Sequence, residues 1–185
     1  GGQDRFQSKE RPRGFFGPNK DPKTGVEFRG GKGNLYEGGL KIPFLVRWPK
    51  VIPANQVSDT PVCSIDLFPT ILEATGTKLP SDRRLDGLSL LGHLKNGKAV
   101  DRDTLVWHFP HYRHDPGPYS ILRQGNWKYL KFWDGPQELY DLKNDPSEAK
   151  NVAESQKERV VTMDALLLKQ LKAQDAKLPR LNPDH

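Results

Sequence analysis

Residues 119–141 read YSILRQGNWKYLKFWDGPQELYD and carry the clearest structural signal in the chain. Their short aromatic and aliphatic runs are separated by two turn dipeptides, Gly125-Asn126 and Asp134-Gly135. Such runs joined by tight turns are typical of antiparallel strands. With a similar run just upstream, they predict a four-stranded meander with strands at 104–109, 119–123, 127–133 and 138–141.

One amphipathic helix should cover this sheet. Over residues 154–173, apolar side chains recur at the spacing of a helix face, namely Val160, Met163, Leu167 and Leu171. The C-terminal part of the chain, residues 99–185, is therefore predicted to be a small α+β subdomain.

The first half of the chain has another pattern. Glycines and prolines make the first 33 residues an extended loop, and the apolar run 42–49 then predicts a mostly buried strand. Residues 64–76 predict a helix capped by Ser64, and a shorter helix follows Ser89. Because strand followed by helix is typical of an α/β layer, we expect residues 1–98 to form an α/β region.

Composition excludes some classes of protein. The 185 residues include 29 Lys and Arg against 23 Asp and Glu, a net charge of +6 that favours anionic partners without choosing among them. No apolar run approaches the roughly 18 residues of a membrane span, so no membrane partner is expected. No export leader is visible, and the single Cys63 cannot form an internal disulfide.

Two segments could carry chemistry. Residues 30–39 contain five glycines around one ammonium, that of Lys32, and such a loop can approach an oxyanion closely. The segment 107–114 offers His108, His111 and Arg113 as donors to an anionic group. Pro110 prevents these histidines from sharing a helix face, so a metal site is not expected there.

Several motifs, in this order, resemble the C-terminal part of a type I sulfatase, a family of the alkaline-phosphatase superfamily. They are GKGNLYEGGLKIP (31–43), SIDLFPT (64–70), DGLSL (86–90), WHFPHY (107–112), RQGNWK (123–128) and ELYDLKNDPSE (138–148). The resemblance implies an α/β fold: the end of an alkaline-phosphatase-like α/β domain, then a small antiparallel four-stranded sheet with a packed C-terminal helix.

The resemblance also implies roles for individual residues. In the family, the lysine at the position of Lys32 lies in the active site and binds the sulfate group, where a fixed cation stabilises the charge of the transition state. The segment with His108, His111 and Arg113 is implied to lie near the substrate. Tyr36, Glu37 and Lys41 are expected to support the loop, with Glu37 accepting from loop amides or pairing with Lys41.

The sequence lacks other parts of the family's machinery. It has no Cys/Ser-x-Pro/Ala-Ser/Thr-Arg motif for formylglycine, no paired aspartates for calcium and no general-acid histidine. Cys63 precedes Ser64-Ile65-Asp66 and is not that nucleophile. The resemblance therefore implies a fragment that is inactive alone, whose own residues bind no cofactor, and which needs the N-terminal part of the same domain to supply calcium and formylglycine.

The expected function is hydrolysis of sulfate esters, with a sulfated small molecule or carbohydrate as substrate because the 107–114 loop is polar and basic. Two alternatives stay open. One is a phosphoester or phosphonate hydrolase of the same superfamily, and the other is a non-catalytic module that binds acidic polysaccharide, with nucleic acid less favoured. Family members are often exported, periplasmic or lysosomal, which leaves the compartment undecided.

Overall fold

The computed structural model describes residues 19–21, 23–112 and 117–180. These form two compact units, one made of residues 19–43 with 103–180 and the other of residues 44–102. The Gly-rich segment, residues 30–39, thus belongs to the same unit as the C-terminal sheet. The expected domain boundary at residue 98 concerns the whole protein and stays a prediction.

The first unit is built on the expected antiparallel meander. Its strands are β1 (Thr104–Phe109), β2 (Tyr119–Gln124), β3 (Trp127–Phe132) and β4 (Gln137–Asp141), which pair in sequence order. Gly125 has a φ of +57°, the left-handed conformation that the tight β2–β3 turn requires. The sequence prediction is confirmed to within one residue at each strand end.

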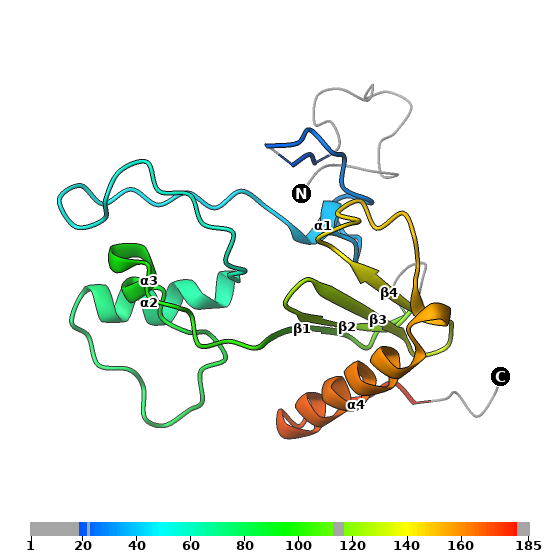
Figure 1. The fold of residues 1–185 in the computed structure, drawn as a ribbon. Coiled ribbons are helices and arrows are strands. Elements are labelled where there is room, and N and C mark those ends of the chain that lie inside the picture. Colours follow the sequence, from blue (N-terminus) through cyan, green and yellow to red (C-terminus); the bar gives the residue numbers. More distant parts are fainter. Residues whose placement is uncertain (1–18, 22, 113–116, 181–185) are drawn as a thin grey trace, which may run out of the picture. The chain divides into compact units, whose positions relative to one another are not determined.

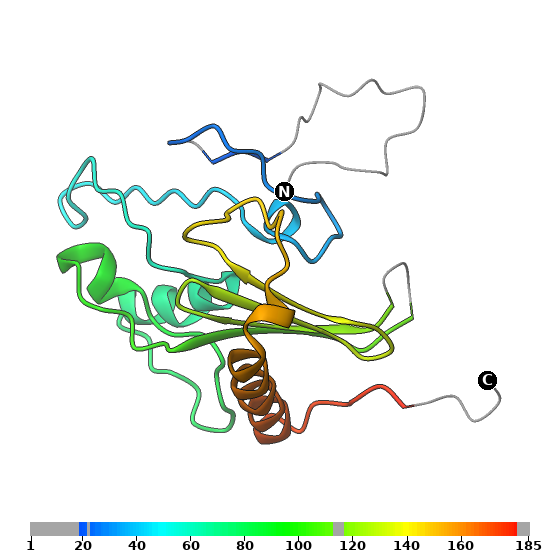
Figure 2. The ribbon, with the colours of Figure 1, turned by 45° about the vertical axis from the view of Figure 1, so that its right-hand side comes forward.

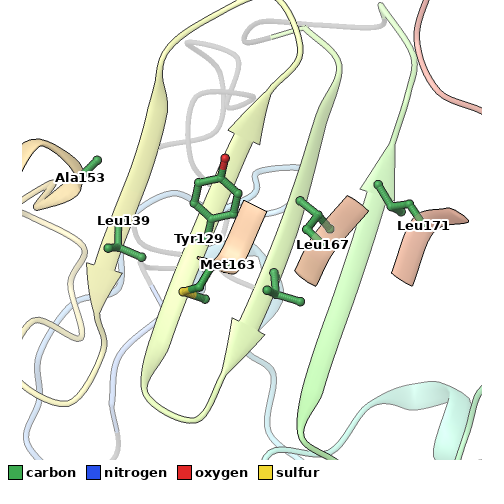
Figure 3. Close-up of a cluster of buried hydrophobic side chains, with 7 residues drawn as sticks. Tyr129, Leu139, Ala153, Met163, Leu167 and Leu171 are labelled. Carbon is green, nitrogen blue, oxygen red and sulfur yellow. The ribbon is translucent and has the colours of Figure 1, made fainter. Parts of the chain in front are cut away.

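Helix α4 (Lys157–Ala173), preceded by the short helix η2 (Ala153–Ser155), packs on one face of this sheet (Figures 1 and 3). The cluster beneath it comprises Leu122, Tyr129, Leu139, Ala153, Met163, Leu167 and Leu171. The helix begins later than expected because Gln156, with φ −124° and ψ 43°, is not helical. The prediction of a helix packed on the sheet is confirmed.

The other face of the sheet is covered by the Gly-rich segment and the single-turn helix α1 (Glu37–Leu40), which lies across the sheet from α4 in both views (Figures 1 and 2). Side chains alternate along a strand, so the residues between those facing α4 point to this side. The buried cluster here comprises Leu35, Tyr36, Ile121, Leu130, Phe132 and Tyr140. The sheet is therefore buried on both faces.

The second unit contains η1 (Ser64–Asp66), α2 (Leu67–Ala74) and α3 (Leu91–Asn96), which confirms the two expected helices. The cap is not Ser64, however. The carboxylate of Asp66 accepts a hydrogen bond from the backbone N–H of Cys63 at 2.8 Å. Pro69 is tolerated because it lies in the first turn of α2, where its missing N–H needs no partner.

The strand expected at 42–49 is not present. This segment is irregular, and its apolar side chains are exposed, with Leu45 at 94% and Ile42 at 59% exposure. A strand needs a hydrogen-bonded neighbour and a face to bury. No other segment in the described part of the chain pairs with it.

Among the described helices, none is long and apolar enough to cross a membrane.

Candidate active site

Lys32 lies at an exposed turn of the Gly-rich segment. The N–H of Asn34 donates to the carbonyl of Gly31 at 2.9 Å, and Gly33 completes the turn with a φ of +84°. Within the described residues, no carboxylate pairs with the Lys32 ammonium.

The two glycines of α1 allow the segment to fold tightly onto itself. A Cβ on Gly38 would lie 2.2 Å from the carbonyl oxygen of Gly30, and one on Gly39 would lie 2.2 Å from that of Asn34. The N–H of Gly38 also donates to the carbonyl of Arg29 at 2.8 Å. Any side chain at these positions would displace the turn that carries Lys32.

A buried charge cluster connects α1 to the sheet. The Nζ of Lys128 lies 3.0 Å from Oε1 of Glu37 and 2.7 Å from Oε1 of Glu148. The backbone N–H of Glu37 donates to Oε2 of Glu148 at 2.6 Å. Lys128 and Glu148 are fully buried. Arg123, 3.6 Å from Oε2 of Glu37, brings a second positive charge to the edge of the cluster.

The cluster is held together by charge compensation. Oε1 of Glu148 accepts no well-aligned hydrogen bond, so its contact with Lys128 is an ion pair. Burial raises the pKa of Glu148, while Lys128 and the N–H of Glu37 act in the opposite direction. Buried charges are costly unless they are paired. Removal of Lys128 would leave the carboxylates of Glu37 and Glu148 without the cation that pairs with both, which would destabilise the cluster.

A second polar cluster lies at the start of the segment. The hydroxyls of Tyr36 and Tyr140 both donate to Oε2 of Glu138, at 2.9 and 2.8 Å. The guanidinium of Arg29 lies 3.6 Å from the ring centroid of Tyr36 and donates to the Tyr140 hydroxyl at 2.8 Å. Burial, followed by the hydrogen bond to Glu138, raises the pKa of both tyrosines, which are therefore neutral donors.

Of the three residues expected to support the loop, Tyr36 and Glu37 contact the sheet, whereas Lys41 does not pair with Glu37. Tyr36 and Glu37 are buried and anchor the segment. Glu37 pairs with Lys128 and not with Lys41, because β3 presents its ammonium directly to α1. Lys41 instead lies 3.7 Å from Asp21 and 4.5 Å from the ring centroid of Phe28.

His108 lies on the face of the sheet that α4 covers, and not on the face that α1 covers. It pairs with Ser120 in the β1–β2 register, on the same face as Leu122. Its Nδ1 is 2.7 Å from the Ser120 hydroxyl, and its Nε2 is 2.9 Å from the carbonyl of Lys177. A carbonyl only accepts, so Nε2 carries a proton and both ring nitrogens are engaged.

His111 and Arg113 were also expected to contact the substrate. His111 is exposed just after β1, with its ring edge-on to Phe109 at a centroid distance of 5.3 Å. Arg113 lies outside the described residues. The substrate-binding roles of His108, His111 and Arg113 therefore stay predictions.

Two sequence motifs of the second unit form a structural centre. The carboxylate of Asp66 accepts from the N–H of Leu88 at 2.9 Å and forms two hydrogen bonds with Arg102. A Cβ on Gly87 would lie 2.0 Å from the carbonyl oxygen of Ile65, so a glycine is required where the segments meet. Although burial opposes it, these partners hold the pKa of Asp66 below its usual range.

A calcium site does not fit the described residues. Among them, no group of three His, Cys, Asp or Glu side chains lies close enough to hold a metal ion. The buried carboxylates are already used, Asp66 by Arg102 and Glu37 and Glu148 by Lys128. Cys63 is half-buried ahead of η1.

The family model for the C-terminal region of N-sulphoglucosamine sulphohydrolase matches residues 31–177. A sulfatase from Formosa agariphila is 34% identical over 157 residues, which cover 75% of this chain and 27% of that protein. An N-acetylgalactosamine-6-O-sulfatase from Bacteroides thetaiotaomicron is 30% identical over 155 residues, 76% of this chain and 29% of that protein.

The crystal structure of Ps i-CgsB in complex with k-i-k-neocarrahexaose superposes with a TM-score of 0.69 at 30% identity, over 84% of this chain and 33% of that chain. The fold and the motifs define a member of the alkaline-phosphatase superfamily. Within it, the chain belongs to the sulfatase family, in that family's C-terminal region. It spans less than a third of the length of the two sulfatases above.

Sequence reasoning missed the residues behind Lys32. The motifs that the sequence shares with sulfatases contain or adjoin four further charged residues, namely Lys128, Glu148, Glu138 and Arg29. The sequence alone assigned no role to any of them. One local signal exists: the run 127–133 contains two lysines among aromatic and aliphatic residues, and a lysine that such a strand buries needs a charged partner. The sequence does not say which carboxylate supplies it.

Proposed function

We propose that this chain is the C-terminal part of an enzyme that hydrolyses sulfate esters, in which Lys32 binds the sulfate group. The observation that carries the proposal is the geometry of the Gly-rich turn. An ammonium without a described counterion lies at the tip of a segment anchored through buried charges. Such a fixed cation stabilises negative charge that develops on the transferring oxygens.

We propose a sulfated carbohydrate as the substrate. Relatives include an N-acetylgalactosamine-6-O-sulfatase and an N-acetylglucosamine-6-O-sulfatase, and Ps i-CgsB was crystallised with a neocarrahexaose. His111, whose imidazole is exposed, and Arg113 would donate to the sugar or its sulfate. His108 would have to exchange one of its two present hydrogen bonds to do the same.

Calcium and formylglycine are proposed to come from the N-terminal part of the enzyme. Formylglycine would supply the nucleophile, and the residues of this chain would bind and orient the sulfate group. The division into residues 1–98 of the catalytic domain and a subdomain of residues 99–185 belongs to the same proposal. The 185-residue chain is accordingly expected to be inactive by itself.

The test compares the full-length polypeptide that contains this chain with the 185-residue chain. The full-length protein should hydrolyse an aryl sulfate faster than the matching aryl phosphate or phosphonate ester, and the chain alone should hydrolyse neither. Faster turnover of the phosphorus esters would favour the alternative hydrolase. Turnover by the chain alone would contradict the proposal that it is a fragment. Salt-dependent heparin binding without turnover by either protein would favour the polyanion-binding module.

The second unit carries an exposed apolar face, which supports the proposal of a missing partner. On α2, the side chains of Leu67, Phe68 and Ile71 are 41%, 51% and 59% exposed. The relatives extend well beyond the part matched here, since the chain covers 27% and 29% of two of them. We propose that the N-terminal part of the same polypeptide covers this face.

The double substitution Phe68→Gln and Ile71→Gln should have different effects in the two proteins. In the 185-residue chain it should reduce binding of a hydrophobic dye and leave stability nearly unchanged. In the full-length protein it should lower the free energy of unfolding by several kcal/mol, because large buried apolar side chains contribute about 2–5 kcal/mol each. Denaturant titrations would measure this, with Val161→Gln on the exposed face of α4 as control. Equal effects in both proteins would contradict the proposed cover.

A further inference from the structure

We propose that Glu148 and Lys128 are positioning residues for Lys32: they hold both ends of the segment 29–37 so that its ammonium meets the sulfate group. The inference rests on the proposed function of Lys32. Neither residue contacts the turn itself. Their effect would pass through the backbone of the segment.

Glu148 binds the segment at its two ends. Its side-chain Oε2 accepts from the backbone N–H of Glu37 at 2.6 Å. Its backbone carbonyl accepts from the guanidinium of Arg29 at 3.2 Å. One residue thus fixes the first and the last residue of the segment that carries Lys32.

The backbone of Glu148 has an uncommon conformation. Its φ is +53°, in the left-handed region that residues other than glycine rarely adopt. This conformation belongs to the residue whose carbonyl and carboxylate contact opposite ends of the segment. Strained backbone of this kind persists only where its surroundings enforce it, and it often marks a functional site.

Lys128 makes this arrangement electrostatically possible. Glu37 and Glu148 are both buried, and their carboxylates would repel each other without a cation between them. The Nζ of Lys128 lies within 3.0 Å of one and 2.7 Å of the other. Since Lys128 lies on β3, an inner strand, it links the segment to the middle of the sheet.

The same strand offers a matched control. Lys131 is also an ion-paired lysine of β3, but it contacts Asp164 of α4 at 2.9 Å on the other face of the sheet. Lys131→Met therefore removes a lysine and a more exposed ion pair from the same strand without touching the segment. A role confined to the stability of the sheet predicts similar effects of Lys128→Met and Lys131→Met on the segment.

The first measurement is hydrogen exchange of the full 185-residue chain. Lys128→Met and Glu148→Ala should speed exchange of the amides of residues 29–40 at least tenfold, with α4 still protected. Lys131→Met should leave those amides unchanged. Glu148→Ala keeps the Lys128–Glu37 pair, so it is the variant to use if Lys128→Met does not fold. Unchanged exchange in residues 29–40, or a uniform rise over the whole unit, would overturn the inference.

The second measurement is a double-mutant cycle in the full-length enzyme with an aryl sulfate. If Glu148 acts through Lys32, Glu148→Ala should lower kcat about tenfold or more by itself and have little further effect on the Lys32→Ala variant. Independent, multiplying effects would contradict positioning. If Lys32→Ala itself leaves kcat unchanged, the proposed function fails, while the exchange data still decide whether Glu148 and Lys128 hold the segment.

Discussion

Lys32→Ala in the full-length enzyme should lower kcat for an aryl sulfate by about 10²–10³-fold, the usual effect of removing one preorganised group that stabilises transition-state charge. The loss should fall mainly on kcat, because charge builds up on the sulfuryl and leaving oxygens only during the reaction. Initial rates over a range of substrate concentrations would separate kcat from KM.

The same variant should leave the fold intact. The Lys32 side chain is exposed and has no ion-pair partner among the described residues, so the free energy of unfolding should change by less than about 0.5 kcal/mol. Lys150→Ala, a second exposed lysine of the same unit, is the control and should preserve kcat. Equal activity of the Lys32 and Lys150 variants would remove the basis for the proposed sulfate site.

Local patterns were sufficient to predict the sheet and its helix. The turns at Gly125-Asn126 and Asp134-Gly135 separate runs of strand-forming residues, and each of these signals lies within a few residues of the structure it predicts. Helix α4 follows equally from the spacing of Met163, Leu167 and Leu171.

The failures concern contacts between distant residues. Glu37 and Lys128 are 91 positions apart, and Glu37 and Glu148 are 111 apart, so no local period relates them. The nearest cation in the sequence, Lys41, looked like the natural partner of Glu37. The pleat of β3 points Lys128 at α1 instead, and only the three-dimensional packing reveals this.

The strand expected at 42–49 failed for a related reason. Its apolar pattern is typical of a buried strand, but burial depends on a neighbour and not on the run itself. Leu45 is almost fully exposed in the described structure. We propose that residues 42–49 contact the N-terminal part of the same polypeptide, as we propose for the exposed face of α2.

Asp66→Ala should be the most destabilising single substitution in the second unit, at about 3–5 kcal/mol, because it leaves the largely buried guanidinium of Arg102 without its counterion. It also removes the acceptor for the N–H groups of Cys63 and Leu88. Hydrogen exchange of the amides of α2 and α3 would report on this unit separately from the sheet.

A control and a pH series identify the cause. Asp82 also pairs with an arginine, Arg83, but both side chains are about two-thirds exposed, so Asp82→Ala should cost less than about 1 kcal/mol. The pKa of Asp66 is lowered in the folded state, so its stabilisation is complete above its ordinary value of 3.8 and is lost as the pH falls through the lowered pKa. The wild-type unit should therefore lose protection in that acid range, while Asp66→Ala should lose little more. An equally steep acid loss in the variant would show that another carboxylate, and not the Asp66–Arg102 pair, holds this unit together.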